Sequence, residues 1–172
     1  ELKIYDFIFI ALHGFEGESG KLQKDLNDLN ILYSGSGPEA CSKTWNKKIT
    51  KKILKKNDIN TPISIGISEF SYQVANNGLN ISPYDCFRPF NYLFLKPDED
   101  GSSIDIFKIS DDESLKNAYK KCTNNKRGFL FEEYIEGREL TVTVIDKECF
   151  PPIEIITKNE FYDYDAKYIS DD

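Results

Sequence analysis

The sequence predicts a mixed α/β and α+β fold, and two regions of the chain support this prediction. Near the start, an apolar run over residues 5–12, a helical pattern over 21–29 and a short apolar run over 31–33 follow in the order of a β-α-β unit. Later, residues 139–145 alternate between apolar and polar side chains, as in an antiparallel strand with one buried face.

Composition limits the classes of protein to consider. With 172 residues, 40% of them hydrophobic, the chain can bury a core in one or two compact units. No apolar run approaches the roughly 20 residues that span a bilayer, and the N-terminus lacks a signal-peptide pattern. Because the net charge is −7, we expect no nucleic-acid partner and no membrane partner. The chain contains no methionine, so we expect it to be a segment of a longer protein.

The cysteines indicate a reducing compartment rather than a metal site. They are widely spaced, form no C-x-x-C pair and are accompanied by a single histidine, which argues against zinc. We expect buried free thiols. The four residues are Cys41, Cys86, Cys122 and Cys149.

The first apolar run, residues 5–12, is nearly continuous and predicts a strand buried on both faces. A glycine-rich turn over 13–20 follows directly, but its spacing matches neither the dinucleotide fingerprint nor a P-loop. His13 falls at the C-terminal end of the strand, where open α/β sheets place ligands. A structural or solvated histidine is the alternative. An amphipathic helix over 21–29 and a parallel strand over 31–33 complete the unit.

Gly37 and Pro38 predict the start of a second helix, with proline at its first position. Trp45, Ile49 and Ile53 recur at helical spacing and define one face of this helix. We expect the lysines on its other faces to be mostly solvated. These are Lys47, Lys48, Lys51, Lys52, Lys55 and Lys56.

Residues 92–104 predict a strand, a polar turn and a second strand. Lys96 ends the first strand, and Gly101 lets the backbone approach a ligand closely. Ser102 and Ser103 add hydroxyl and N–H donors, a combination that suits phosphate oxygens. An ordinary hairpin with a solvated tip is the alternative.

The remaining pattern is simpler. Pro62 opens a predicted strand over 63–67, and residues 68–90 predict connecting structure. The later predicted elements are a helix over 111–122, a strand over 128–135, an antiparallel pair formed by 139–145 and 152–157, and a polar, tyrosine-rich loop over 161–172.

Several motifs occur in a fixed order along the chain. They are Ala11-Leu12-His13-Gly14, Gly17-Glu18, Tyr33-Ser34-Gly35-Ser36-Gly37, Lys96-Pro97 with Gly101-Ser102-Ser103, Glu132-Glu133-Tyr134-Ile135, Gly137-Arg138-Glu139-Leu140-Thr141, and Phe161 to Tyr168. In this order and spacing they resemble the D-alanine–D-alanine ligases of the ATP-grasp superfamily, over essentially the whole chain. The resemblance implies the end of an N-terminal α/β substrate domain (1–36), a central ATP-grasp domain (37–136) and the start of a C-terminal ATP-grasp domain with a substrate-covering loop (137–172).

The resemblance implies a function as well. Ligases of this family use ATP to phosphorylate one D-alanine and join it to a second, for peptidoglycan precursor synthesis. The implied cofactors are ATP and Mg²⁺, with the metal ligands expected downstream of this chain, so we expect no ligation by the 172 residues alone. A homodimer is common in the family. The implied location is the cytoplasm, or a plastid-type organelle in a eukaryote.

The resemblance also implies a nucleotide site. Lys47 and Lys96 match lysines that contact ATP, and Glu132 matches an acidic residue of the adenine pocket. The segment after Glu132 would read the adenine edge with free backbone groups, and Glu139 would bond the ribose hydroxyls. The expected nucleotide-binding residues are Lys47, Lys96, Ser102, Ser103, Glu132, Glu133, Tyr134, Ile135 and Glu139.

Four residues are expected to be catalytic by the same resemblance. Ser102 and Tyr168 would join an upstream glutamate in orienting the ammonium of the first D-alanine. Lys167 would neutralise the transferring phosphoryl group, and His13 would lie near the first substrate's carboxylate. Residues 161–168 would form a loop that covers the site and excludes water.

The chain departs from the family's pattern at three positions. Asp105 stands where the phosphate loop usually has a glycine, Asn46 where an aspartate is usual, and Trp45 where a methionine is usual. Residues 98–100 also make the loop acidic. These departures keep two alternatives open, namely another ATP-grasp carboxylate–amine ligase and a degenerate nucleotide-binding module without catalysis.

Overall fold

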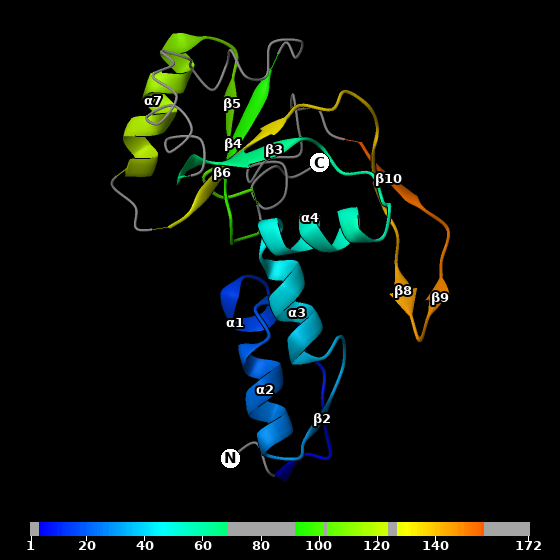
Figure 1. Cartoon of the computed structure of the whole chain (residues 1–172). Helices are drawn as coiled ribbons and strands as arrows, with labels where there is room; N and C mark the ends of the chain where they lie inside the picture. Colours follow the sequence, from blue (N-terminus) through cyan, green and yellow to red (C-terminus); the bar gives the residue numbers. More distant parts are fainter. Residues whose placement is uncertain (1–3, 69–91, 102, 124–126, 157–172) are drawn as a thin grey trace.

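The computed structural model describes residues 4–68, 92–101, 103–123 and 127–156. The N-terminal helices lie at one end of the molecule and a four-stranded sheet lies at the other, with helix α4 (Lys47–Lys56) between them (Figure 1). In the described ranges, no helix is both long enough and apolar enough to cross a lipid bilayer.

The chain begins with the predicted β-α-β unit. β1 (Phe7–Ile8) pairs in parallel with β2 (Leu32–Tyr33), and helices α1 (Phe15–Glu18) and α2 (Lys21–Asp28) lie between them in the sequence. Helix α2 and the parallel pairing confirm the prediction from the sequence.

The predicted burial of residues 5–12 is wrong. Phe9 is 76% exposed and Leu12 is 56% exposed. The strand is short, and among the described strands β1 pairs only with β2, so no neighbour covers both of its faces.

The glycine-rich turn allows backbone segments to approach one another. A Cβ atom on Gly17 would lie 2.2 Å from the carbonyl oxygen of Leu12. One on Gly20, whose φ is +91°, would lie 2.3 Å from the carbonyl oxygen of Pro38. These glycines therefore serve the packing of α1, α2 and the following helix.

The lysine-rich region forms two helices where the sequence predicts one. Helix α3 (Pro38–Trp45) begins at Pro38 with Gly37 as its N-cap, as predicted. Asn46 then adopts an extended conformation, and its Oδ1 accepts a hydrogen bond from the N–H of Ile49 at 3.0 Å. Because an asparagine can satisfy a free N–H at a helix start, Asn46 both ends α3 and caps α4.

Helix α4 turns lysines, rather than isoleucines, toward the rest of the molecule. Ile49 and Ile53 are 41% and 39% exposed, whereas Lys51 is only 8% exposed. Lys47 lies one turn before Lys51, on the same side of the helix. The expectation of solvated lysines is therefore wrong for Lys51, and the reason lies in the sheet that this side of α4 faces.

All neighbouring strands of the four-stranded sheet are antiparallel, in the order β3-β6-β4-β5. The sequence predicts all four strands. The second strand predicted within residues 92–104 begins later than expected, because Ser103 and Asp105 adopt positive φ angles in a turn that precedes it. The strands are β3 (Ser64–Gly66), β4 (Leu93–Pro97), β5 (Phe107–Ile109) and β6 (Phe129–Glu133).

The two faces of this sheet differ in chemistry. Helix α7 (Asp112–Thr123), predicted from the sequence, packs on one face. The opposite face, which we call the polar face, carries Phe94, Lys96 and Glu132, because side chains alternate along each strand and Phe94 pairs with Glu132. The core between α7 and the sheet consists of Leu93, Leu95, Ile109, Leu115, Ala118, Cys122, Phe129 and Phe131.

The C-terminal strands form two small antiparallel ribbons. The predicted pairing of 139–145 with 152–157 is confirmed, but the predicted half-burial is wrong: Leu140 and Ile153 are 51% and 60% exposed. In the described ranges each ribbon has two strands and no third. The strands are β7 (Glu139–Thr141), β8 (Val144–Ile145), β9 (Glu148–Cys149) and β10 (Ile153–Ile155), with β7 paired to β10 and β8 to β9.

The described cysteines are free thiols, but only one is buried. Cys122 lies in the core, and burial raises the pKa of its thiol to about 11. Cys41 is half-buried and Cys149 is exposed, so the expectation of buried thiols is wrong for these two. Cys86 lies outside the described residues.

Candidate functional site

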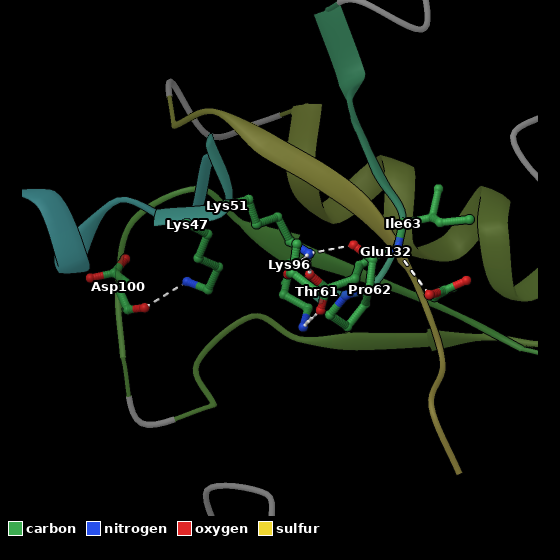
Figure 2. Close-up of polar contacts among 9 residues, drawn as sticks. Lys47, Lys51, Thr61, Pro62, Ile63, Lys96, Asp100 and Glu132 are labelled. Atoms are coloured by element: carbon green, nitrogen blue, oxygen red, sulfur yellow. Dashed lines mark hydrogen bonds and ion pairs between the residues drawn. The ribbon is translucent and has the colours of Figure 1, made fainter. Parts of the chain in front are cut away.

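A carboxylate lies between two ammonium groups on the polar face (Figure 2). Glu132 of β6, 8% exposed, forms ion pairs with Lys96 of β4 and with Lys51 of α4, and the second pair has an Nζ–Oε2 distance of 2.6 Å. Lys51 also donates hydrogen bonds to the hydroxyl of Thr61 and to the carbonyl of Pro62, at 2.9 and 2.7 Å. Buried charges require such partners, and these contacts fix α4 against the sheet.

Replacing the buried lysine by methionine (Lys51→Met) is expected to lower the free energy of unfolding by about 2 kcal/mol, because charged hydrogen bonds are lost and their acceptors stay buried. Urea denaturation measures this change. Lys52→Met, at the exposed neighbouring position, is the matched control and should change stability by less than about 0.5 kcal/mol. Equal stability of the two variants would contradict the orientation of α4.

A third lysine, Lys47, lies at the start of α4 beside an acidic turn, residues 98–101. Its Nζ donates a hydrogen bond to the carbonyl of Asp100 at 2.8 Å, and its backbone N–H donates to the carbonyl of Asp98 at 2.8 Å. Burial and the nearby charge of Lys96 lower the pKa of Lys47 below its ordinary value. The carboxylates of Asp98 and Asp100 also act on this ammonium group, but they form ion pairs with Lys48 and Arg127. Glu132 is then the remaining carboxylate beside the ammonium groups of Lys47, Lys51 and Lys96, and this excess of positive charge suits an anionic ligand.

The acidic turn uses its carboxylates to hold its own conformation. Asp98 forms an ion pair with Lys48, with an Oδ2–Nζ distance of 2.5 Å. Glu99 accepts a hydrogen bond from the side-chain amide of Asn46 at 3.0 Å. An aspartate at position 46, which the resembling family usually has, would place a second carboxylate beside Glu99. The asparagine at position 46 is therefore compatible with the acidic residue at position 99.

Aromatic side chains extend the polar face beyond Lys96. The ring of Tyr134 packs edge-on against Tyr92 and at a tilt against Phe94, with centroid separations of 5.9 and 5.6 Å. The Nζ of Lys108 lies 3.9 Å from the ring centroid of Tyr92. An aromatic surface next to ammonium groups is suited to a flat base that is linked to phosphates.

The structure brings together part of the set of residues predicted from the sequence. Lys47, Lys96 and Glu132 meet on the polar face, and Tyr134 lies on the same face. Glu133 does not join them: it alternates to the other side of β6, and its Oε1 accepts a hydrogen bond from the N–H of Ile63 at 2.9 Å.

Three other predicted residues lie away from this group in the described structure. His13, Ile135 and Glu139 are exposed, and Ser103 lies in the turn before β5 with a φ of +59°. Ser102, Lys167 and Tyr168 lie outside the described residues.

The backbone after Glu132 corrects one expectation. The N–H of Glu133 donates to the carbonyl of Ile63 at 3.0 Å, and that of Tyr134 donates to the carbonyl of Tyr92 at 3.3 Å. Hydrogen bonding to the neighbouring strands continues to Tyr134, so the expectation of free backbone groups is wrong for these two N–H groups.

Three residues of the site were not predicted from the sequence. Lys51 follows Lys47 at the i, i+4 spacing of a helix face, which is the signal that could have identified it. Tyr92 precedes Lys96 by an even number of strand residues, which places the two side chains on one face. Lys108 carries no such local signal, because only the register of β5 with β4 places it opposite Phe94.

The sequence of this chain is similar to a known protein family over most of its length. Residues 64–172 match the family model described as D-ala D-ala ligase C-terminus. D-alanine–D-alanine ligase B of Clostridium perfringens is 34% identical over 169 residues, which cover 98% of this chain and 53% of the relative. The chain thus spans about half the length of the curated relatives that it matches.

Solved structures agree with this assignment. A D-alanine–D-alanine ligase from Bacillus anthracis complexed with ATP superposes with a TM-score of 0.73 at 29% identity, covering 93% of this chain and 51% of the other. The VanG D-Ala:D-Ser ligase from Enterococcus faecalis has a TM-score of 0.72 at 27% identity, covering 96% and 47%. These likenesses confirm the predicted mixed fold, and together the matches show that the chain belongs to the D-alanine–D-alanine ligase family.

Proposed function

We propose that this chain forms the nucleotide-binding part of an enzyme that joins two D-alanines to D-alanyl-D-alanine, for peptidoglycan precursor synthesis. The observation that carries the proposal is the convergence of Lys47 and Lys96 with Glu132 (Figure 2). The ring of Phe94 lies between Lys96 and the ring of Tyr134 and extends the group toward the aromatic side chains. Family membership supports the proposal, because the curated relatives carry that activity in their names.

The ammonium groups of Lys47 and Lys96 bind the phosphate oxygens of ATP in this proposal. Both already hold oxygen acceptors, the carbonyl of Asp100 and the carboxylate of Glu132, so each is positioned to donate. Bound ATP supplies the phosphoryl group that activates a carboxylate. Cations that are already fixed in place stabilise the charge of the transferring phosphoryl group with little reorganisation. Electrostatic stabilisation of this kind is the main catalytic contribution of sites that transfer phosphoryl groups.

The base of the nucleotide lies against the aromatic part of the polar face in this proposal, beside Tyr134 and Tyr92. We assign Ile135 and Glu139 to the rim of the same site, with the carboxylate of Glu139 bonding the ribose. Glu133 supports the site by holding the start of β3 through Ile63.

The substrate side of the site remains a proposal from family resemblance. His13 lies near the carboxylate of the first D-alanine, and Ser102 and Tyr168 orient its ammonium. Ser102 and Ser103 bond the phosphates, and Lys167 neutralises the transferred group. The three-part division at residues 36 and 136, a cytoplasmic or plastid-type location and a homodimer belong to the same proposal.

Magnesium is not assigned to residues of this chain. In the described ranges, no group of three His, Cys, Asp or Glu side chains could hold a metal ion.

Release of phosphate from ATP, measured with the protein at its natural length, tests the proposed reaction. Release that depends on D-alanine and yields the dipeptide supports it. Turnover that requires D-serine as the second substrate would favour the activity named for the Enterococcus faecalis relative. Nucleotide binding without turnover under any of these amino acids would favour a module that has lost catalysis.

A further inference from the structure

One guanidinium group joins both ends of the loop that leads from β4 to β5. Arg127 forms an ion pair through one terminal nitrogen with Asp100 and through the other with Asp105. Its side chain is 33% exposed, and those of the two aspartates are 28% and 38% exposed, so the contacts are partly shielded from water. Arg127 lies two residues before the start of β6, which carries Glu132.

Both aspartates adopt backbone conformations that favour glycine. The φ angle is +99° at Asp100 and +54° at Asp105. Residues that carry a side chain rarely adopt this left-handed backbone conformation. Where they do, contacts with neighbouring residues usually hold the backbone in place. The bridge to Arg127 is such a contact. It explains how an aspartate can stand at position 105, where the family usually has a glycine.

The same loop contacts the proposed phosphate site. The carboxylate of Asp100 is held by Arg127, while its carbonyl accepts the hydrogen bond from Nζ of Lys47 at 2.8 Å (Figure 2). A shift of Asp100 would therefore change the position of the Lys47 ammonium group. Without Arg127, the carboxylates of Asp100 and Asp105 would also lose this counter-charge. The carboxylate of Asp100 lies close enough to Lys47 to affect its pKa, so an uncompensated charge there would repel phosphates.

We propose that Arg127 is a positioning residue of the nucleotide-phosphate site. It holds Asp100 and Asp105 so that the loop keeps Lys47 in place and neither carboxylate turns toward the phosphates. In this chain the bridge to Asp105 takes over the role of a glycine in allowing the loop conformation. The proposal rests on the proposed function, because it concerns the same phosphate site.

Calorimetry with the non-hydrolysable analogue AMP-PNP and with adenosine, on the protein at its natural length, tests this role. Arg127→Gln is expected to weaken AMP-PNP binding about tenfold and to leave adenosine binding unchanged, because the loop acts on the phosphates. Arg127→Lys keeps the charge but lacks the two-pronged geometry, and it should weaken AMP-PNP binding about threefold. Arg138→Gln, at an exposed arginine, is the matched control and should bind like the wild type.

The second-site variant gives a readout that a merely structural role would not produce. Adding Asp105→Gly to Arg127→Gln removes one unpaired carboxylate and supplies the residue that suits a positive φ, so affinity for AMP-PNP should return to within about threefold of the wild type. Wild-type affinity in Arg127→Gln, no recovery in the double variant, or equal losses for AMP-PNP and adenosine would each overturn the role of Arg127. Failure of the wild type to bind AMP-PNP would overturn the proposed function itself.

Discussion

Replacing Glu132 by glutamine is expected to lower the free energy of unfolding by about 3 kcal/mol, because removing one member of a buried charge pair leaves the other uncompensated. The effect is large here because two lysines depend on this carboxylate. Lys51 and Lys96 have side chains that are only 10% and 17% exposed, and both bond to Glu132. Urea denaturation followed by circular dichroism measures the change.

The matched control for this variant is Glu136→Gln, an exposed position three residues after β6. It removes the same charge from the chain and should alter stability by less than about 0.5 kcal/mol. If Glu132→Gln were as stable as this control, with an unchanged denaturant slope, the ion-pair group on the polar face would not exist in solution.

Replacing Lys96 by methionine is expected to weaken the binding of AMP-PNP about 100-fold, or about 2.7 kcal/mol. A hydrogen bond to a charged group contributes roughly 1.5–3 kcal/mol, and this loss lies at the upper end because Lys96 is largely shielded from water. Calorimetry measures the affinity. Adenosine, which has no phosphate, should bind Lys96→Met and wild type alike.

Lys116→Met provides the control, since Lys116 is exposed on α7, which packs on the other face of the sheet. It should bind AMP-PNP like the wild type. Because Lys96→Met also removes an ion pair with Glu132, its unfolding curve must show that the variant is folded at the temperature of the titration. A folded Lys96→Met that kept wild-type affinity would exclude this lysine from the phosphate site.

Much of the fold could be predicted because local patterns determine it. The helical spacing of Leu22, Leu26 and Leu29 gives α2, and Gly37 before Pro38 gives the start of α3. The apolar strands of the four-stranded sheet were also predicted. Burial was harder to predict: the runs near Phe9 and Leu140 have the composition of buried strands, yet both are exposed in the described structure.

The site was predicted only in part, because its chemistry depends on tertiary pairing. Lys47, Lys96 and Glu132 belong to motifs of the family, whereas the sequence pattern predicts a solvated face for Lys51. A pattern of apolar residues in the sequence cannot show that Lys51 binds buried oxygens of Glu132 and Pro62, because these acceptors lie far from it in the sequence or in another element. From the sequence alone, the acidic residues 98–100 count against phosphate binding, because their ionic partners cannot be identified there.

The structure gives the acidic residues different roles. Asp98 pairs with Lys48, and Glu99 accepts a hydrogen bond from Asn46. Asp105 pairs with Arg127, which lies more than 20 residues later in the sequence and which no local pattern connects to it. These pairings are consistent with a working phosphate site, and they reduce the support for the degenerate alternative.

A crystal structure of the protein at its natural length with AMP-PNP tests the central claim most directly. We expect phosphate oxygens within hydrogen-bonding distance of Nζ of Lys47 and Nζ of Lys96, and the adenine against the ring of Tyr134. Asp100 and Asp105 should both remain bonded to Arg127 in this complex. A nucleotide bound away from the polar face, or phosphates that contact neither lysine, would contradict the account.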